Sequence, residues 1–274
     1  MKRNVNIVDT TLRDGEQSAG KAFTIEQKLK IAKYLDDNGI YQIECGIPAM
    51  GCLEQEIIKA IKANTKNALI STWNRLNIDD IKASIDCKPH IIHISVPVSD
   101  LQIYENLNRD KKWIEENLIR CIYYIKEHGF DVTVGFEDAS RADIKYIIEL
   151  SCLIEKLGVN RIRYSDTVGI LSLLKTKNVV NEIRRNSNLQ VEIHAHNDFG
   201  MALGISVEAV KSGAEFVDCT LDGIGERTGN CSLQEFLKIS RNFECNYEIN
   251  NDNAIKKTLI DIIKNKMVPM NRTL

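Results

Sequence analysis

The stretch LQVEIHAHNDFG, residues 189–200, combines a short strand pattern with two histidines and then opens a helical segment. The apolar run ends at His194, and His196 follows two positions later. Because side chains at i and i+2 of a strand point to the same face, both imidazoles can reach one divalent ion. A useful site needs a third ligand, and Asp14 in the stretch DTTLRDGEQ, residues 9–17, is the candidate. The fold must then bring the two ends of the chain together.

A short β-branched run followed by a longer helical pattern occurs eight times along the chain. The predicted strands are 4–8, 41–45, 68–72, 90–96, 131–135, 160–164, 189–194 and 216–221. The predicted helices are 24–38, 50–63, 77–85, 111–128, 140–157, 172–186, 201–212 and 231–243. Eight such units predict an α/β fold, a TIM (β/α)8 barrel over residues 1–250. A doubly wound open sheet is the alternative, but its first loop is usually glycine-rich, whereas loop 10–17 is charged.

The composition is that of an ordinary globular protein: 274 residues, 43% hydrophobic and 27% charged, with a net charge of −2. Neither a nucleic-acid partner nor a membrane partner is expected from this charge. No apolar run approaches the roughly 20 residues of a membrane span, and the N-terminus MKRN lacks the apolar core of a signal peptide. A cytoplasmic location is expected, and the eight cysteines, which form no CxxC pair, are interpreted as reduced core thiols.

Polar side chains gather where the predicted strands end, which is where TIM-barrel active sites lie. They are Arg13, Asp14, Glu44, Trp73, Arg75, His93, Ser95, Glu137, Asp138, Asp166, Thr167, His194, His196 and the loop 225–230. Each has a simpler explanation on its own. His93 is explained as a core histidine, Glu137 and Asp138 as a helix cap, and Glu226 with Arg227 as a surface ion pair. Their convergence on one rim favours an active site.

Three stretches, residues 9–17, 194–198 (HAHND) and 225–230 (GERTGN), closely resemble signatures of the 2-isopropylmalate synthase and homocitrate synthase family. This family belongs to the DRE-TIM metallolyase superfamily, and the resemblance runs from about residue 4 to residue 272. It implies a TIM barrel that catalyses a metal-dependent Claisen condensation of acetyl-CoA with a 2-oxo acid. It also places a C-terminal helix and the start of a linker in residues 251–274.

The resemblance implies roles for individual residues. The implied metal ligands are Asp14, His194 and His196, with Asn230 as a further ligand or supporting group, for Mg²⁺, Mn²⁺ or Zn²⁺. The implied substrate-binding residues are Gln17, Glu44, His93, Ser95 and Thr167. Arg13 matches the catalytic arginine and can stabilise an alkoxide as it forms. Glu137 is the carboxylate expected to carry protons.

The expected 2-oxo acid is 2-oxoglutarate, because several segments look most like a nitrogen-fixation type of homocitrate synthase. These segments are residues 71–75, 93–100 and 132–143. Lysine-pathway enzymes carry an arginine where this chain has Thr133, so Arg75 or Arg141 is expected to bind the distal carboxylate. Isopropylmalate and citramalate synthases are alternatives. So are a hydroxymethylglutaryl-CoA-type lyase, which would carry a cysteine loop in place of residues 225–230, and a non-catalytic subunit.

Family synthases continue beyond the barrel into a helical region whose His and Tyr reach a neighbouring active site. This sequence stops at residue 274, where the resemblance places the start of the linker. We therefore expect the barrel subunit of a split enzyme, a complementary subunit that supplies the C-terminal region, and an oligomer.

Overall fold

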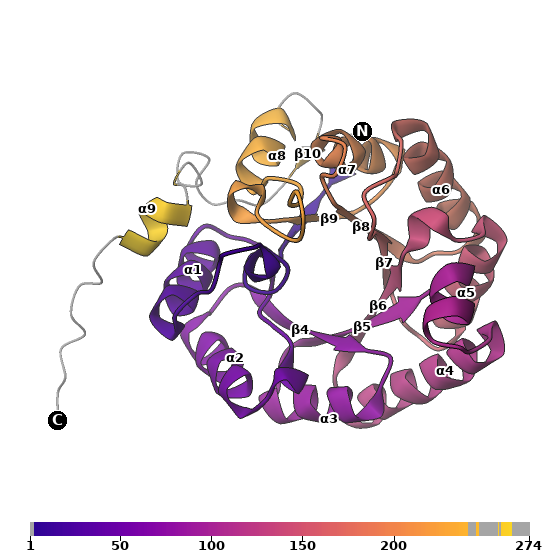
Figure 1. Cartoon of the computed structure of the whole chain (residues 1–274), viewed down its shortest axis with the longest axis horizontal. Helices are drawn as coiled ribbons and strands as arrows, with labels where there is room; N and C mark the ends of the chain where they lie inside the picture. The colour runs from indigo at the N-terminus through magenta and orange to yellow at the C-terminus, as the bar shows by residue number, and fades with distance from the viewer. Residues whose placement is uncertain (1–2, 241–244, 247–256, 258, 265–274) are drawn as a thin grey trace.

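The computed structural model describes residues 3–240, 245–246, 257 and 259–264. In this part of the chain, eight parallel strands close into a barrel in the order of the sequence, with helices around it (Figure 1). The barrel strands are β2 Asn6–Asp9, β3 Gln42–Glu44, β4 Leu69–Arg75, β5 Ile91–Pro97, β6 Asp131–Glu137, β7 Arg161–Asp166, β8 Gln190–Ala195 and β9 Phe216–Cys219. The helices are α1 Ile25–Asp37, α2 Cys52–Asn64, α3 Ile78–Cys87, α4 Lys111–Glu127, α5 Ile144–Lys156, α6 Leu173–Asn186, α7 Ala202–Ser212, α8 Leu233–Ser240 and α9 Leu259–Lys264. The predicted TIM (β/α)8 barrel is confirmed.

The alternation of side chains along each strand explains how the barrel presents its polar residues. In β5, Ile92 and Ile94 are buried in the hydrophobic core, while His93 and Ser95 line a cavity inside the barrel. All eight strands are parallel, so their carboxyl ends meet at one rim. Residues that follow different strands in the sequence are therefore gathered at that rim.

The barrel interior is unusually polar for this fold, whose interior is usually filled by branched apolar side chains. Arg161 and Arg163 of β7 are both buried and share Glu192 of β8 as an ion-pair partner. Arg163 also pairs with Glu44 of β3 and Asp218 of β9. These side chains form a buried ion network beneath the rim, and we call them the floor network.

Three strands extend two or three residues further than their hydrophobic patterns predict, and one of them is β7, which continues through Asp166 and pairs there with Ala195 of β8. β4 continues through Arg75, which pairs in register with Ser95, and β6 continues through Glu137. The backbone ladder with β5 holds these polar ends extended, a tertiary effect that periodicity does not show. A π-helical turn, Leu101–Asn106, and the short pair β1 Arg3–Asn4 with β10 Cys245–Asn246 were not predicted.

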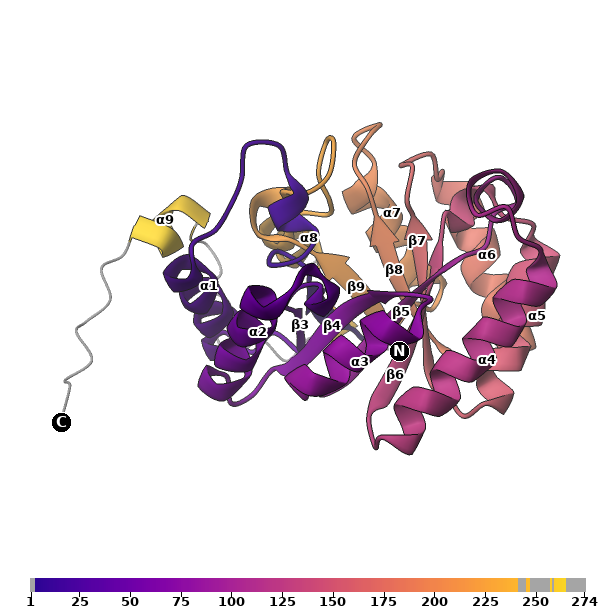
Figure 2. The ribbon, with the colours of Figure 1, turned by 60° about the horizontal axis from the view of Figure 1, so that its bottom comes forward.

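Most of the segment 251–274 lies outside the described residues, including the expected linker. Within it, α9 packs beside α1 at the edge of the barrel (Figures 1 and 2). Of the predicted helix 231–243, residues 233–240 form α8, and residues 241–243 also lie outside the described residues. Among the described residues, no helix is both long and apolar enough to cross a membrane.

The interpretation of the cysteines as core thiols holds for most of them but not for all. The buried free thiols are Cys45, Cys87, Cys121, Cys219 and Cys231. The prediction is wrong for Cys52, which is exposed at the first position of α2, and Cys152 on α5 is only half-buried. The side chain of Cys245 lies outside the described part of the structure.

Candidate active site

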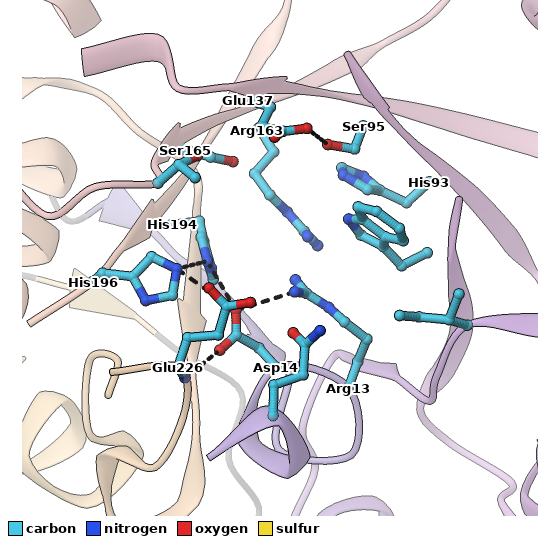
Figure 3. A pocket seen from close by; sticks show the side chains of 14 residues that line it. Arg13, Asp14, His93, Ser95, Glu137, Arg163, Ser165, His194, His196 and Glu226 are labelled. Atoms are coloured by element: carbon cyan, nitrogen blue, oxygen red, sulfur yellow. Dashed lines mark hydrogen bonds and ion pairs between the residues drawn. The ribbon is translucent and has the colours of Figure 1, made fainter. Parts of the chain in front are cut away.

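One cavity of about 230 Å³ opens among the residues at the carboxyl ends of the barrel strands (Figure 3). Its lining residues are Arg13, Asp14, Gln17, Ile47, Trp73, His93, Ser95, Glu137, Arg163, Ser165, Thr167, His194, His196 and Glu226. Most of the site residues expected from the sequence are therefore brought together. Glu44 and Asn230 are exceptions, because they are buried behind the lining residues.

Asp14, His194 and His196 form the tightest cluster of this cavity. His194 lies in β8 and His196 just beyond it, and the two Nε2 atoms are 3.3 Å apart. Oδ2 of Asp14, from the loop after β2, lies 3.3 Å from Nε2 of His194 and 3.7 Å from Nε2 of His196. Figure 3 shows the three side chains converging, Asp14 from one segment and the two histidines from another. Residue 14 and residues 194–196, which are far apart in the sequence, thus meet as predicted.

The donor set and its spacing fit a divalent ion. Ligand atoms about 2.1 Å from one ion lie about 3.0–3.4 Å apart at octahedral or tetrahedral angles. The three distances in the cluster are close to this range. All three residues are buried, and one ligand atom from each lies within 4.8 Å of the others. Two imidazoles and one carboxylate suit Mg²⁺, Mn²⁺ or Zn²⁺.

Neighbouring polar groups hold the cluster in place. Asp218 Oδ2 lies 3.0 Å from Nδ1 of His194, an arrangement that orients the ring and directs Nε2 toward the cluster. Asn230 Nδ2 donates to Oδ1 of Asp14 at 2.8 Å. Its buried Oδ1 has no hydrogen-bond partner among the described residues, so this oxygen is available as a further ligand for a cation. A side chain at Gly225 would overlap both Asn230 and Asp14, which explains the glycine that opens GERTGN.

The electrostatics of the cluster favour a positive charge beside the Asp14 carboxylate. Burial alone would lower the pKa of His194, but hydrogen bonds with Asp14 and Asp218 raise it to about 9. Burial and the neighbouring His194 lower the pKa of His196 to about 4. Burial opposes ionisation of Asp14, yet Arg13 and His194 hold its pKa well below the usual value. A divalent cation held at the Nε2 atoms of the two histidines would stabilise the same Asp14 carboxylate.

Arg13 connects the cluster of Asp14, His194 and His196 to the floor network. Its Nη1 lies 3.1 Å from Oδ2 of Asp14, and its Nε donates to Oε1 of Glu44 at 2.5 Å. Its guanidinium carbon lies 5.9 Å from the centre of the Trp73 ring. Burial opposes ionisation of Glu44, but Arg13 and Arg163 hold the pKa of this carboxyl below its usual value. Glu44 therefore fixes the two arginines from behind instead of lining the cavity.

Glu137 lies on the opposite side of the cavity, at the end of β6. Ser95 donates to its Oε2 at 3.1 Å. Burial raises the pKa of Glu137, and the nearby carboxylates of Asp138 and Glu226 raise it further. A carboxyl group with a raised pKa can exchange protons near neutral pH. Thr167 lies close by, because its hydroxyl accepts a hydrogen bond from the backbone N–H of Asp138 at 2.8 Å.

His93 occupies the inner wall of the cavity. Its Nδ1 lies 2.9 Å from the hydroxyl of Thr133. A side chain at Gly135 would overlap Nε2 of His93, so the glycine makes room for the ring. Burial, and after it the charge of Arg163, hold the pKa of His93 well below its ordinary value. His93 is therefore a neutral hydrogen-bonding group in this wall.

The structure corrects the expected origin of the cavity's second cation. Arg75 is largely exposed and pairs with Asp80, and Arg141 pairs with Asp138, so neither lines the cavity. Arg163 lines it instead. Sequence reasoning missed this residue, although a signal was present. The strand RIRYSD, residues 161–166, places two arginines on one face of a strand that must be buried on both faces.

Comparisons with known proteins show the family of the chain. The HMGL-like family model matches residues 4–256. The homocitrate synthase subunit alpha of Clostridium pasteurianum is 47% identical, and the alignment covers 93% of this chain and 98% of the relative. The 2-isopropylmalate synthase 2 of Caldanaerobacter subterraneus subsp. tengcongensis is 41% identical, with 85% of this chain and 61% of the relative covered. A homocitrate synthase of Frankia alni is also 41% identical, over 84% of this chain and 66% of the relative.

The chain thus spans nearly all of the first relative but only about three fifths to two thirds of the other two. Among solved structures, the HMG-CoA lyase of Bacillus subtilis has a TM-score of 0.83 at 16% identity, covering 96% of this chain and 92% of that one. At this identity the likeness shows the fold alone. The family match over most of the chain and the high identity to these relatives show that the chain belongs to the HMGL-like family of DRE-TIM proteins.

Proposed function

We propose that this chain catalyses the condensation of acetyl-CoA with 2-oxoglutarate, giving homocitrate and CoA. One observation carries the proposal: the buried cluster of Asp14, His194 and His196 faces a cavity that also contains two arginines and a carboxyl group with a raised pKa. The names of the relatives support it, since they include homocitrate synthases and 2-isopropylmalate synthases. The overall reaction consumes one water, which cleaves the thioester and releases CoA.

Asp14, His194 and His196 would hold the divalent ion, Mg²⁺, Mn²⁺ or Zn²⁺, with Asn230 either supporting Asp14 or adding a ligand. A bound ion would supply Lewis-acid polarisation of the ketone of the 2-oxo acid. Asp218 keeps His194 oriented toward this position.

Arg13 stabilises the negative charge that develops on the ketone oxygen as the new carbon–carbon bond forms. Its guanidinium is permanently charged and lies against Asp14. Glu44 fixes it from behind, so it does not need to reorganise during the reaction. Removal of one such preorganised donor typically costs about 3–4 kcal/mol of transition-state stabilisation.

Glu137 accepts and donates protons through its carboxyl group, and the hydrogen bond from Ser95 keeps its Oε2 oriented. Its raised pKa brings the group closer to neutral pH, where a general base or acid is most effective. Gln17, His93 and Thr167 line the cavity around it and bind or orient the substrates.

We further propose that a second polypeptide completes the enzyme in an oligomer. The support is the name of the 47% identical relative, a subunit alpha that this chain covers almost completely. The synthases of Caldanaerobacter and Frankia, which are not named as subunits, extend well beyond the matched region.

A substrate panel tests the proposal. The metal-loaded chain, with its complementary polypeptide, is supplied with acetyl-CoA and 2-oxoglutarate, 2-oxoisovalerate or pyruvate, and the release of free CoA is followed. We expect 2-oxoglutarate to react fastest. A preference for 2-oxoisovalerate would assign a 2-isopropylmalate synthase, and a preference for pyruvate a citramalate synthase. Cleavage of hydroxymethylglutaryl-CoA without condensation would assign a lyase.

A further inference from the structure

We propose that Arg163 binds the second carboxylate of a 2-oxo diacid and thereby selects 2-oxoglutarate over 2-oxo monoacids. This inference rests on the proposed function and assigns a subsite within the same cavity.

The first step of the argument is the position of Arg163. It lies in the middle of β7 and points into the barrel, with only 2% of its surface exposed. Figure 3 shows its guanidinium projecting into the cavity between His194 and His93. A ligand anchored at the cluster of Asp14, His194 and His196 and extended toward the inner wall would pass over the guanidinium of Arg163.

The second step is the way Arg163 is held. Its Nη2 donates to Oε2 of Glu44 at 2.8 Å, and its Nε pairs with Glu192 and lies 3.0 Å from Oδ2 of Asp218. These acids come from three different strands and fix the plane of the guanidinium. A guanidinium has five N–H donors, so these contacts leave donors on Nη1 and Nη2. We assign these donors to the substrate carboxylate, whose two oxygens match the fork of an arginine.

The third step is that the two arginines of the cavity contact different ends of the substrate. In the part of the chain that the structure describes, Arg13 and Arg163 are the permanently charged cations that line the cavity. Arg13 lies against Asp14 and therefore serves the 2-oxo end of the substrate. Arg163 serves the other end. Arg161, two residues earlier on the same strand, donates to Gln42 at 2.6 Å and does not line the cavity.

The fourth step concerns the wall around the subsite, where the nearby hydrogen-bonding side chains His93 and Ser95 carry no positive charge and already have partners. His93 is engaged through Nδ1 with Thr133, and Ser95 with Glu137. A carboxylate placed here would be desolvated by its surroundings, so it needs a full positive charge. A methyl group in the same place would leave the cavity-facing donors of Arg163 without partners, which penalises the monoacid.

The experiment compares two ligands that differ only at the distal end. Calorimetry with the Mn²⁺-loaded full chain gives dissociation constants for 2-oxoglutarate and for 2-oxopentanoate, which has the same carbon chain without the second carboxylate. Because both ligands share the 2-oxo acid end, the ratio of their dissociation constants cancels any change in binding at the cluster of Asp14, His194 and His196. We expect the wild type to prefer the diacid roughly 10- to 100-fold, as for a charge-assisted hydrogen-bonded pair.

Arg163→Gln should reduce this ratio to about one, and Arg163→Lys, which keeps the charge but loses the fork, should give an intermediate ratio. Arg161→Gln is the matched control: it removes a buried cation from the same strand and the same floor network, and it should keep the wild-type ratio. An unchanged ratio in Arg163→Gln would overturn the proposal, as would an equal loss in Arg161→Gln.

Arg163→Gln leaves Glu44 and Glu192 short of a partner, and such a variant can fail to fold. In that case the wild-type ratio and the Arg163→Lys ratio decide, and equal wild-type affinities for the two ligands would overturn the subsite. The proposed function fails separately, if no 2-oxo acid binds and no CoA is released. Condensation of monoacids as readily as diacids would keep the synthase and remove the role of Arg163.

Discussion

Asp9 offers a quantitative test of the structure, because it is a buried acid with an incomplete set of partners. It ends β2 and is fully buried. Its Oδ1 accepts a hydrogen bond from the backbone N–H of Thr11 at 2.9 Å, while its Oδ2 has no partner among the described residues. Burial, with a smaller contribution from the charge of Asp218, raises its pKa from 3.8 to about 7.

This shift fixes both the sign and the size of the effect. Between pH 4 and pH 7 the folded chain binds a proton at Asp9 that the unfolded chain has released, so stability falls as the pH rises. A shift from 3.8 to about 7 is about three units, and one unit corresponds to 1.36 kcal/mol. The charged carboxylate therefore costs roughly 4 kcal/mol above pH 7, and Asp9→Asn should recover most of it.

The assay is urea unfolding of the wild type and the variant at pH 5 and pH 8. We expect Asp9→Asn to be more stable than the wild type by roughly 4 kcal/mol at pH 8 and by only about 1–2 kcal/mol at pH 5, where most of the folded chains still carry the proton on Asp9. Asp36→Asn is the matched control, because both oxygens of Asp36 accept backbone N–H groups of residues 66–68. There the same substitution should cost about 1–3 kcal/mol. Equal gains for Asp9→Asn at both pH values would refute the reasoning.

Four further predictions concern the site. His194→Ala should abolish divalent-ion binding in a titration with nearly unchanged circular dichroism, whereas the exposed control His128→Ala should bind normally; unaltered affinity in His194→Ala would contradict the ligand assignment. Glu137→Gln should lower turnover about 10²- to 10⁴-fold and keep 2-oxo acid binding, so unchanged turnover would exclude a role in proton transfer. Gly135→Ala should displace His93 and lower turnover by about 10²-fold in steady-state assays, and wild-type rates would show that the ring position is unimportant. Adding the complementary polypeptide should raise turnover about 10²- to 10⁴-fold, and full activity of the purified chain alone would refute the split-enzyme proposal.

The sequence predicted the barrel well because periodicity and strand chemistry act locally. Each run of β-branched residues became a strand, and parallel strands then fixed which rim His194, His196 and Asp14 share. The floor network could not be read in this way. Whether Arg163 meets Glu44, 119 residues away, depends on barrel closure, which no local pattern encodes. For the same reason Arg75, a polar residue at a strand end, was a reasonable candidate that proved to face solvent.

The floor network links the two ends of the proposed reaction site. Asp218 contacts both His194 and Arg163, and Glu44 contacts both Arg163 and Arg13. Burying these charges costs desolvation free energy that their mutual pairing offsets, so the removal of any member leaves a neighbour with fewer partners. The same pairing holds Arg13 between Glu44 and Asp14, and it holds Arg163 among Glu44, Glu192 and Asp218. The buried charges beneath the cavity therefore hold His194, Arg13 and Arg163 in position. An apolar barrel floor would avoid the desolvation cost of these charges, but it would leave both arginines without a fixed orientation.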